Sequence, residues 1–159
     1  MSSAETTAPD YMHLALEEAA KAGARGEVPV GAVIVGPVGD KTQILAQTDN
    51  AMRGTQDATA HAEILAIRAA CQRLGNERLQ GCDLYVTLEP CPMCAGAIAE
   101  ARLRRVYYGA ADIKGGAVDH GVALFDQPSC HHHPEVYGGL QETACAALLT
   151  EFFDLRRNG

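Results

Sequence analysis

Two short stretches of the sequence combine side chains that bind metal ions with one that moves protons. In "ATAHAEILAI", His61 and Glu63 interrupt a largely apolar run, and in "LEPCPMC", Cys91 and Cys94 stand three residues apart. Imidazole and thiolate are zinc ligands, and a catalytic zinc ion with three protein ligands keeps its fourth position for water. Zinc lowers the pKa of that water, and a nearby carboxylate can take up its proton. The residues therefore predict a catalytic zinc site of His61, Cys91 and Cys94, with Glu63 as general acid and base.

The C-x-x-C pair has a second interpretation when it is considered alone. Dithiol redox pairs also lie where a strand leads into a helix, and a helix N-terminus favours a thiolate in either case. His61 alone could be a core or capping histidine, and Glu63 alone could be a solvated acid in a first helical turn. A thiol–disulfide protein that uses Cys91 and Cys94 is therefore the alternative from a different class.

Regular elements must hold these stretches in place, and the hydrophobic periodicity predicts their positions. The predicted helices cover 9–24, 60–74, 90–103 and 140–157, and the predicted strands cover 28–35, 42–49, 82–89, 104–110 and, as a short fifth, 135–139. On the last helix the expected packed face consists of Leu140, Ala144, Ala147, Leu148, Phe152 and Leu155. The strand-to-helix crossovers favour an α/β fold with a central mixed sheet of about five strands and helices on both faces.

Length and composition indicate one ordinary globular domain over residues 1–159. The N-terminus has no basic and apolar signal regions, and the longest apolar run is interrupted by glycine and proline, so we expect a cytoplasmic location and no membrane association. In that compartment six cysteines do not predict a disulfide framework. The formal net charge of −7, taken alone, argues against a nucleic-acid partner.

Five segments resemble the bacterial tRNA-specific adenosine deaminase family, which lies within the cytidine/deoxycytidylate deaminase superfamily. "DATAHAEILAIRAA" and "LYVTLEPCPMCAGAI" carry the H-x-E and P-C-x-x-C signature of zinc-dependent nucleobase deaminases, which alone would indicate only the superfamily. "EVPVGAVIV", "RRVYYGAADIKGGA" and "CAALLTEFFDLRR" narrow the resemblance, which covers about residues 11–157.

The resemblance implies a three-layer α-β-α cytidine-deaminase-like fold, one Zn2+ per subunit on His61, Cys91 and Cys94, and Glu63 as the general acid and base. The implied reaction is hydrolytic deamination of adenosine to inosine, at the wobble position of a tRNA anticodon loop, by a homodimer. By the same resemblance, Asn50 matches an asparagine that hydrogen-bonds the purine; without it, Asn50 would be interpreted as a turn residue.

Asp112 and Lys114 match a loop that borders the RNA in the family; without the resemblance they would be polar turn residues. Two features depart from the family pattern. The segment "CHHHP", with Cys130, His131, His132 and His133, could contact RNA, bind a second metal or be a polar loop. The acidic balance leaves any basic track to Arg53, Arg102, Arg104, Arg105, Arg156 and Arg157. The alternative enzyme is a deaminase of a free base or nucleoside, of guanine or cytosine type.

Overall fold

A five-stranded mixed sheet forms the centre of the protein in the computed structural model, which describes residues 9–158. The strands are β1 (Gly31–Val38), β2 (Lys41–Asp49), β3 (Asp83–Leu88), β4 (Arg105–Ala110) and β5 (Glu135–Tyr137). Across the sheet their order is β2-β1-β3-β4-β5. β1 is antiparallel to β2 and β3, whereas β3, β4 and β5 run parallel to one another. The mixed sheet of five strands predicted from the sequence is thereby confirmed.

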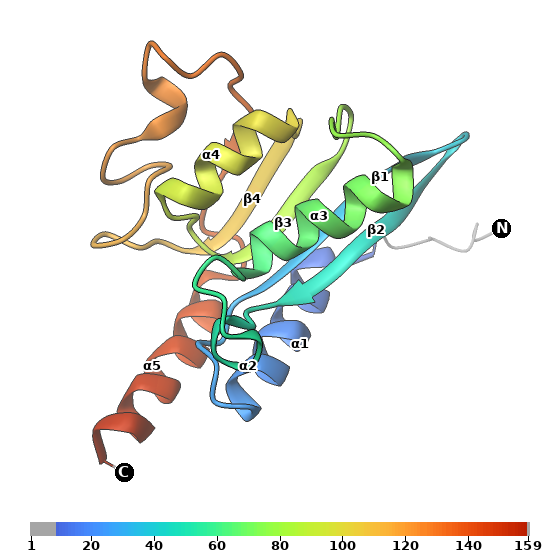
Figure 1. Ribbon diagram of the computed structural model, residues 1–159. Helices are drawn as coiled ribbons and strands as arrows, with labels where there is room; N and C mark the ends of the chain where they lie inside the picture. The colour runs from blue at the N-terminus through green and yellow to red at the C-terminus, as the bar shows by residue number, and fades with distance from the viewer. Residues whose placement is uncertain (1–8, 159) are drawn as a thin grey trace, which may run out of the picture.

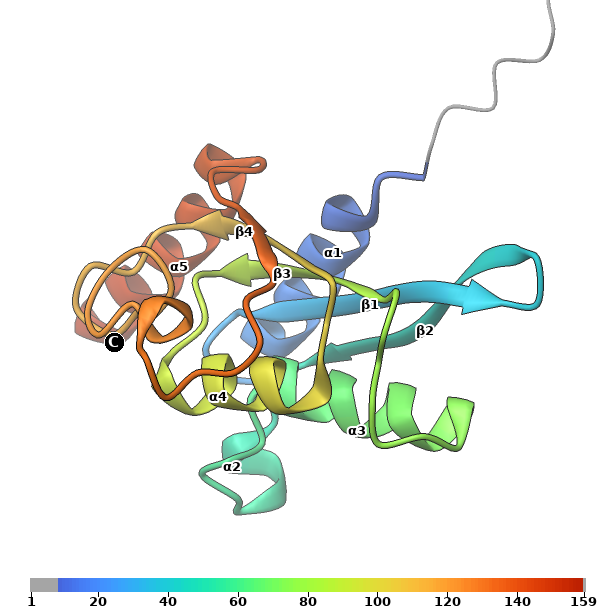
Figure 2. The same cartoon turned by 90° about the horizontal axis from the view of Figure 1, so that it is seen from above.

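Helices cover both faces of this sheet (Figures 1 and 2). The helices are α1 (Tyr11–Ala24), the short α2 (Met52–Thr55), α3 (Ala62–Leu74), α4 (Pro92–Ala101) and α5 (Glu142–Asn158), with a 3-10 turn at Leu124–Asp126. α3 and α4 pack on one face around the larger buried cluster, and α1 and α5 pack on the other around a smaller one. This is the three-layer α-β-α arrangement that the resemblance implied.

The helix ends follow local signals in the sequence. Asp10 caps α1, because its Oδ1 accepts a hydrogen bond of 3.0 Å from the backbone N–H of His13. Gly75 ends α3 in the left-handed conformation at φ 64°, where the sequence predicted the stop. The four-residue helix α2 was missed, because a single turn is too short to produce a hydrophobic period. None of the helices within residues 9–158 has the length and apolar content needed to cross a membrane.

The packed face predicted for the last helix was wrong in part: Leu148 and Phe152 are half-buried, but Ala144 and Ala147 are exposed. α5 begins at Glu142, and it buries Cys145 while Ala146 and Leu149 pack against the cores. Leu155 is 69% exposed, and Leu140 lies before the helix. The reason is that α5 meets the sheet with its first turns only, and its last turns extend beyond the sheet (Figure 1). Periodicity identifies a helix, but it cannot show where the neighbouring surface ends.

Candidate active site

The starts of α3 and α4 hold the three predicted metal ligands. His61 is the N-cap of α3 and Cys91 is the N-cap of α4, and both have extended backbone angles. Pro92 occupies the first position of α4, where its missing N–H costs no hydrogen bond. Cys94 lies in the first turn of α4 and is buried. Because α3 and α4 pack together on one face of the sheet, the two helix starts meet.

The ligand atoms form a triangle of the size that a zinc ion requires. His61 Nδ1 lies 3.7 Å from Cys91 Sγ and 3.5 Å from Cys94 Sγ. All three ligand atoms lie within 4.8 Å of one another. Zinc–sulfur and zinc–nitrogen bonds at a tetrahedral angle place nitrogen and sulfur about 3.6 Å apart. The donor set and its spacing therefore fit a tetrahedral zinc ion with three protein ligands.

The two thiols are poised for a cation. A hydrogen bond from the Cys94 thiol lowers the pKa of Cys91 to about 5, with help from backbone N–H groups at the helix start and from His61. The same hydrogen bond, together with burial, raises the pKa of Cys94. The sulfurs thus share one proton between them, and a divalent cation would displace it, because thiolates are the ligands that zinc binds.

Glu63 places a carboxyl group beside this triangle. It lies in the first turn of α3 and is only 4% exposed. Burial raises the pKa of Glu63 to about 7, and the carboxyl also experiences the charges of Cys91 and His61. A carboxyl group with a pKa near neutrality can both accept and return a proton, which is the property that a general acid and base needs.

Asn50 is buried where β2 leads toward α3, and its amide joins two backbone segments. Its Nδ2 donates to the carbonyl of Val28 at 3.0 Å, and its Oδ1 accepts from the N–H of Ala62 at 2.8 Å. Ala62 directly follows His61, so Asn50 fixes the start of α3. An amide side chain has two N–H groups and two lone pairs, so one donor and one acceptor of Asn50 remain for another partner.

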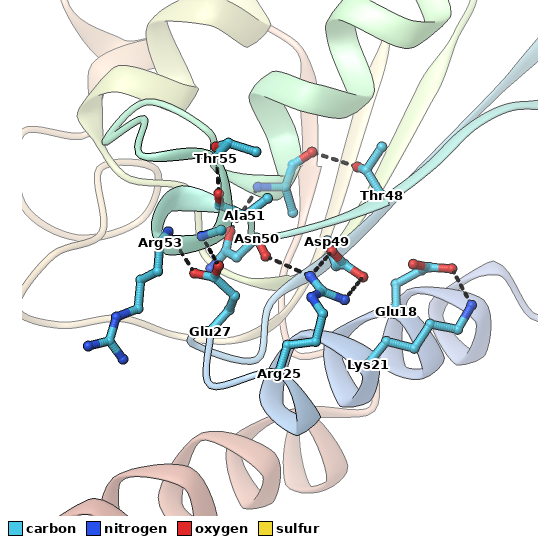
Figure 3. Close-up of polar contacts among 12 residues, drawn as sticks. Glu18, Lys21, Arg25, Glu27, Thr48, Asp49, Asn50, Ala51, Arg53 and Thr55 are labelled. Carbon is cyan, nitrogen blue, oxygen red and sulfur yellow. Dashed lines mark hydrogen bonds and ion pairs between the residues drawn. The ribbon is translucent and has the colours of Figure 1, made fainter.

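Two residues that the sequence did not single out hold the backbone around Asn50 (Figure 3). Glu27 accepts hydrogen bonds from the backbone N–H groups of Arg53 at 3.0 Å and Gly54 at 2.8 Å. Arg25 pairs with Asp49 at 2.6 Å and also donates to the Asn50 carbonyl at 3.2 Å. Nothing in the local pattern marks these contacts, because each joins residues at least twenty-four positions apart.

Asp112 and Lys114 lie on the loop after β4. This loop packs against Glu89 and Pro90, the two residues before Cys91. The N–H of Asp112 donates to Glu89 at 3.0 Å, and its Oδ1 accepts from the N–H of Gly115 at 2.9 Å. Lys114 is exposed. The loop is held to Pro90 as well, because the N–H of Ala117 donates to the Pro90 carbonyl at 2.9 Å.

The histidine segment does not form a second metal site. Within residues 9–158, His61, Cys91 and Cys94 are the one group of three or more ligand-type side chains close enough to share a metal. His132 Nε2 instead donates to the Leu103 carbonyl at 2.6 Å, and Cys130 Sγ donates to the His132 carbonyl at 3.2 Å. All six cysteines are free thiols, as expected for a chain without a disulfide framework.

Five of the six arginines suggested for a basic track make side-chain contacts in different parts of the fold. Arg104 pairs with Asp83 at 2.8 Å and Arg105 with Glu135 at 3.2 Å, so acids offset both charges. Arg102 donates to the carbonyl of His131 at 3.4 Å. Arg53 and Arg156 do converge, because both donate to the Gly26 carbonyl, at 3.2 Å and 2.6 Å.

Comparison with known proteins agrees with this geometry. Residues 5–110 match the family described as the cytidine and deoxycytidylate deaminase zinc-binding region. The chain is 56% identical over 147 residues to the tRNA-specific adenosine deaminase of Agrobacterium fabrum, which covers 92% of this chain and 94% of the relative.

Two solved structures are similar at the level of the whole chain. One comes from a study of A-to-I editing by tRNA:A34 deaminases at the wobble position, with a TM-score of 0.82, 57% identity, and coverage of 87% of this chain and 98% of the other. The other is the guanine deaminase of Bacillus subtilis, with a TM-score of 0.59, 33% identity, and coverage of 92% of each chain.

Proposed function

This chain belongs to the cytidine and deoxycytidylate deaminase family and, within it, to the bacterial tRNA-specific adenosine deaminases, and we therefore propose that it converts adenosine to inosine in tRNA by zinc-dependent hydrolysis. One observation in the structure carries the chemistry. Three ligand atoms at tetrahedral spacing lie beside the buried carboxyl group of Glu63. This arrangement leaves one metal position open and puts a proton carrier next to it.

The proposed site has one zinc ion per chain, held by His61, Cys91 and Cys94. When bound, zinc supplies Lewis-acid activation of a water molecule and lowers the pKa of that water. Glu63 accepts one proton from the attacking water and passes it to the purine ring nitrogen. It then takes the second proton from the hydroxyl group formed at C6 and passes it to the amino group, which leaves C6 as ammonia while C6 becomes a carbonyl. Burial of Glu63 supports this role, because a carboxyl group with its pKa near neutrality is efficient in both directions.

Asn50, Asp112 and Lys114 are the proposed substrate-binding residues. The free donor and acceptor of the Asn50 amide suit a purine edge, which offers both kinds of partner. The target adenosine must leave its stack to reach a buried centre, and an anticodon loop makes this easier because its bases are unpaired. We therefore place the target at the wobble position of the anticodon, where the similar deaminases of the solved structure act.

A local positive surface can offset the net charge of −7 when RNA binds. Arg53 and Arg156 meet at the Gly26 carbonyl, although they lie far apart in the sequence. We call Arg53 and Arg156 the basic corner. Glu27 accepts a hydrogen bond from the backbone N–H of Arg53, so the basic corner is attached to the segment that carries Asn50. We propose that the corner binds phosphates of the anticodon stem and loop.

The remaining parts of the proposal concern organisation and location. Residues 1–159 act as a single deaminase domain. The active form is a homodimer, as the resemblance to the bacterial tRNA-specific adenosine deaminases implies. The protein works in the cytoplasm, where its tRNA substrate is found. Sedimentation of the zinc-loaded protein tests the dimer.

Incubation with total tRNA and, separately, with guanine, cytosine and free nucleosides tests the substrate. Inosine in hydrolysed tRNA, without ammonia from the small molecules, is the expected result. Ammonia from guanine with unmodified tRNA would support the free-base alternative, which the similarity to a guanine deaminase keeps open. A zinc-free protein that forms a reversible Cys91–Cys94 disulfide would support the redox alternative.

A further inference from the structure

The carboxylate of Glu89 is fully buried beneath the loop that follows β4, and it belongs neither to the metal ligands nor to the proposed acid and base. Glu89 directly follows β3 and stands two residues before Cys91. A buried carboxylate requires hydrogen-bond partners, because an unpaired buried charge is strongly unfavourable. The loop supplies all of the partners that this carboxylate has in the structure.

Five donors converge on the two oxygens of Glu89. Oε1 accepts from the N–H of Asp112 at 3.0 Å and from His120 Nδ1 at 2.7 Å. Oε2 accepts from the N–H groups of Val118 at 3.1 Å, Asp119 at 3.0 Å and His120 at 3.1 Å. A carboxylate only accepts hydrogen bonds, so it matches this set of donors without conflict.

The loop is shaped to approach this carboxylate closely. A Cβ atom added to Gly116 would lie 2.6 Å from the carboxyl carbon of Glu89 and 2.7 Å from Oε2, a spacing that only glycine permits. Asp119, whose N–H donates to Glu89, also accepts a hydrogen bond on its side chain from the Tyr108 hydroxyl of β4. Residues 112–120 therefore surround the Glu89 carboxylate, and the hydrogen bond between Tyr108 and Asp119 attaches them to β4 as well.

We propose that Glu89 is a positioning residue, which fixes the loop of Asp112 and Lys114 in the conformation that binds RNA. The inference rests on the proposed function for the role of that loop. Glu89 links the loop directly to the metal centre, because Pro90 and Cys91 continue the chain from it. Through this link, a short stretch of chain presents both the metal ligands and the substrate loop at fixed relative positions.

We call the contact between the Glu89 carboxylate and residues 112–120 the anchor. Glu89→Gln changes the carboxylate, and Gly116→Ala changes the loop. Glutamine keeps the size of Glu89 but turns an NH2 group toward backbone donors that it cannot accept from. Gly116→Ala leaves Glu89 and its neighbour Cys91 unchanged and pushes the loop away. Asp83→Asn is the matched control, because Asp83 is also a buried carboxylate, lies at the opposite end of β3 and is paired with Arg104.

Cleavage by a lysine-specific protease reports on the loop without any assumption about the substrate. The chain has three lysines, which are Lys21, Lys41 and Lys114. Native zinc-loaded protein is treated briefly, and mass spectrometry measures the cut after Lys114 relative to the cut after Lys41. We expect Glu89→Gln and Gly116→Ala to raise this ratio about tenfold, because local opening exposes the loop. Asp83→Asn should leave the ratio unchanged.

Zinc content and steady-state kinetics on tRNA complete the test. In both anchor variants we expect unchanged zinc and a KM about tenfold higher, with kcat altered much less, because binding rather than chemistry is impaired. Asp83→Asn should lower the melting temperature without moving KM.

Cleavage after Lys114 at the wild-type rate in both anchor variants would overturn the anchor. Faster cleavage with an unchanged KM would overturn its role in substrate binding. If the wild-type protein modifies no tRNA at all, the proposed function fails, and the cleavage ratio still decides whether Glu89 holds the loop.

Discussion

His61 Nδ1 lies 3.5 Å from Cys94 Sγ, although the two residues are 33 positions apart in the chain. The two side chains belong to the starts of different helices, so the contact depends on α3 and α4 packing side by side on one face of the sheet. With this contact, the two thiols of the C-x-x-C pair and the imidazole occupy three corners of a tetrahedron. It also explains why the helix starts are polar while the helices behind them are apolar.

Replacement of Glu63 by glutamine should abolish deamination while leaving zinc binding and the fold intact. Glutamine has nearly the same shape but cannot carry a proton between water and substrate. Removal of a general acid and base typically costs about 10²- to 10⁴-fold in rate. Inosine formation measures the loss, and metal analysis with circular dichroism is the control. Wild-type activity in this variant would rule out the proposed mechanism.

Replacement of Cys91 by alanine should reduce the zinc content to a small fraction of the wild-type value and lower the melting temperature. The remaining two ligands cannot complete a stable tetrahedral site. Cys145→Ala is the matched control, because Cys145 is another free thiol but is buried in the core between α5 and the sheet. Full zinc content in Cys91→Ala would contradict the ligand assignment.

Replacement of Asn50 by alanine should weaken both the fold and substrate binding. The change leaves the Val28 carbonyl and the Ala62 N–H without their buried partner, a loss of about 1–3 kcal/mol in the free energy of unfolding. Urea unfolding measures the loss of stability, and KM on tRNA measures the loss of substrate binding. Retained zinc is expected. A destabilised protein with unchanged KM and kcat would restrict Asn50 to a structural role.

Replacement of Arg53 or Arg156 by alanine should weaken tRNA binding and make it less dependent on salt. Each lost phosphate contact on single-stranded RNA reduces the slope of log K against log salt concentration by about 0.7. Binding titrations at several salt concentrations provide the slope. Arg105→Ala is the control, because Glu135 already offsets that charge. Equal slopes in all three variants would remove the basic corner from the proposal.

The free energy of unfolding should fall at alkaline pH, because Tyr85 ionises less readily in the folded protein than in the unfolded chain. Burial, with a smaller effect of the stacked Tyr107, raises the pKa of Tyr85 to about 12 from the ordinary 10.0. The unfolded chain releases this proton first, so the contribution is complete below pH 10 and is lost as the pH rises toward 12. Urea midpoints from pH 9 to 12 measure the loss, and Tyr85→Phe should make it shallower. Identical pH profiles for the two proteins would contradict this assignment.

The sequence alone was sufficient for the features that depend on local pattern. Helix and strand periods, Pro92 at the start of α4 and the stop at Gly75 all act over a few residues, so the elements lie close to their predicted positions. The H-x-E and P-C-x-x-C pairs could also be recognised, because each is a short spacing with a distinct chemistry. The resemblance then connected them to one family, and the comparisons confirmed that family.

Only the tertiary structure decided which distant groups meet. It buried Glu63 beside the ligand triangle, joined the Asn50 amide to the start of α3, brought Arg53 and Arg156 to one carbonyl, and wrapped the loop around Glu89. It also turned the last turns of α5 away from the sheet, against the helical pattern. The physical reason is the same throughout: burial and long-range hydrogen bonds depend on how whole elements pack, whereas a pattern along the chain reports only on its near neighbours.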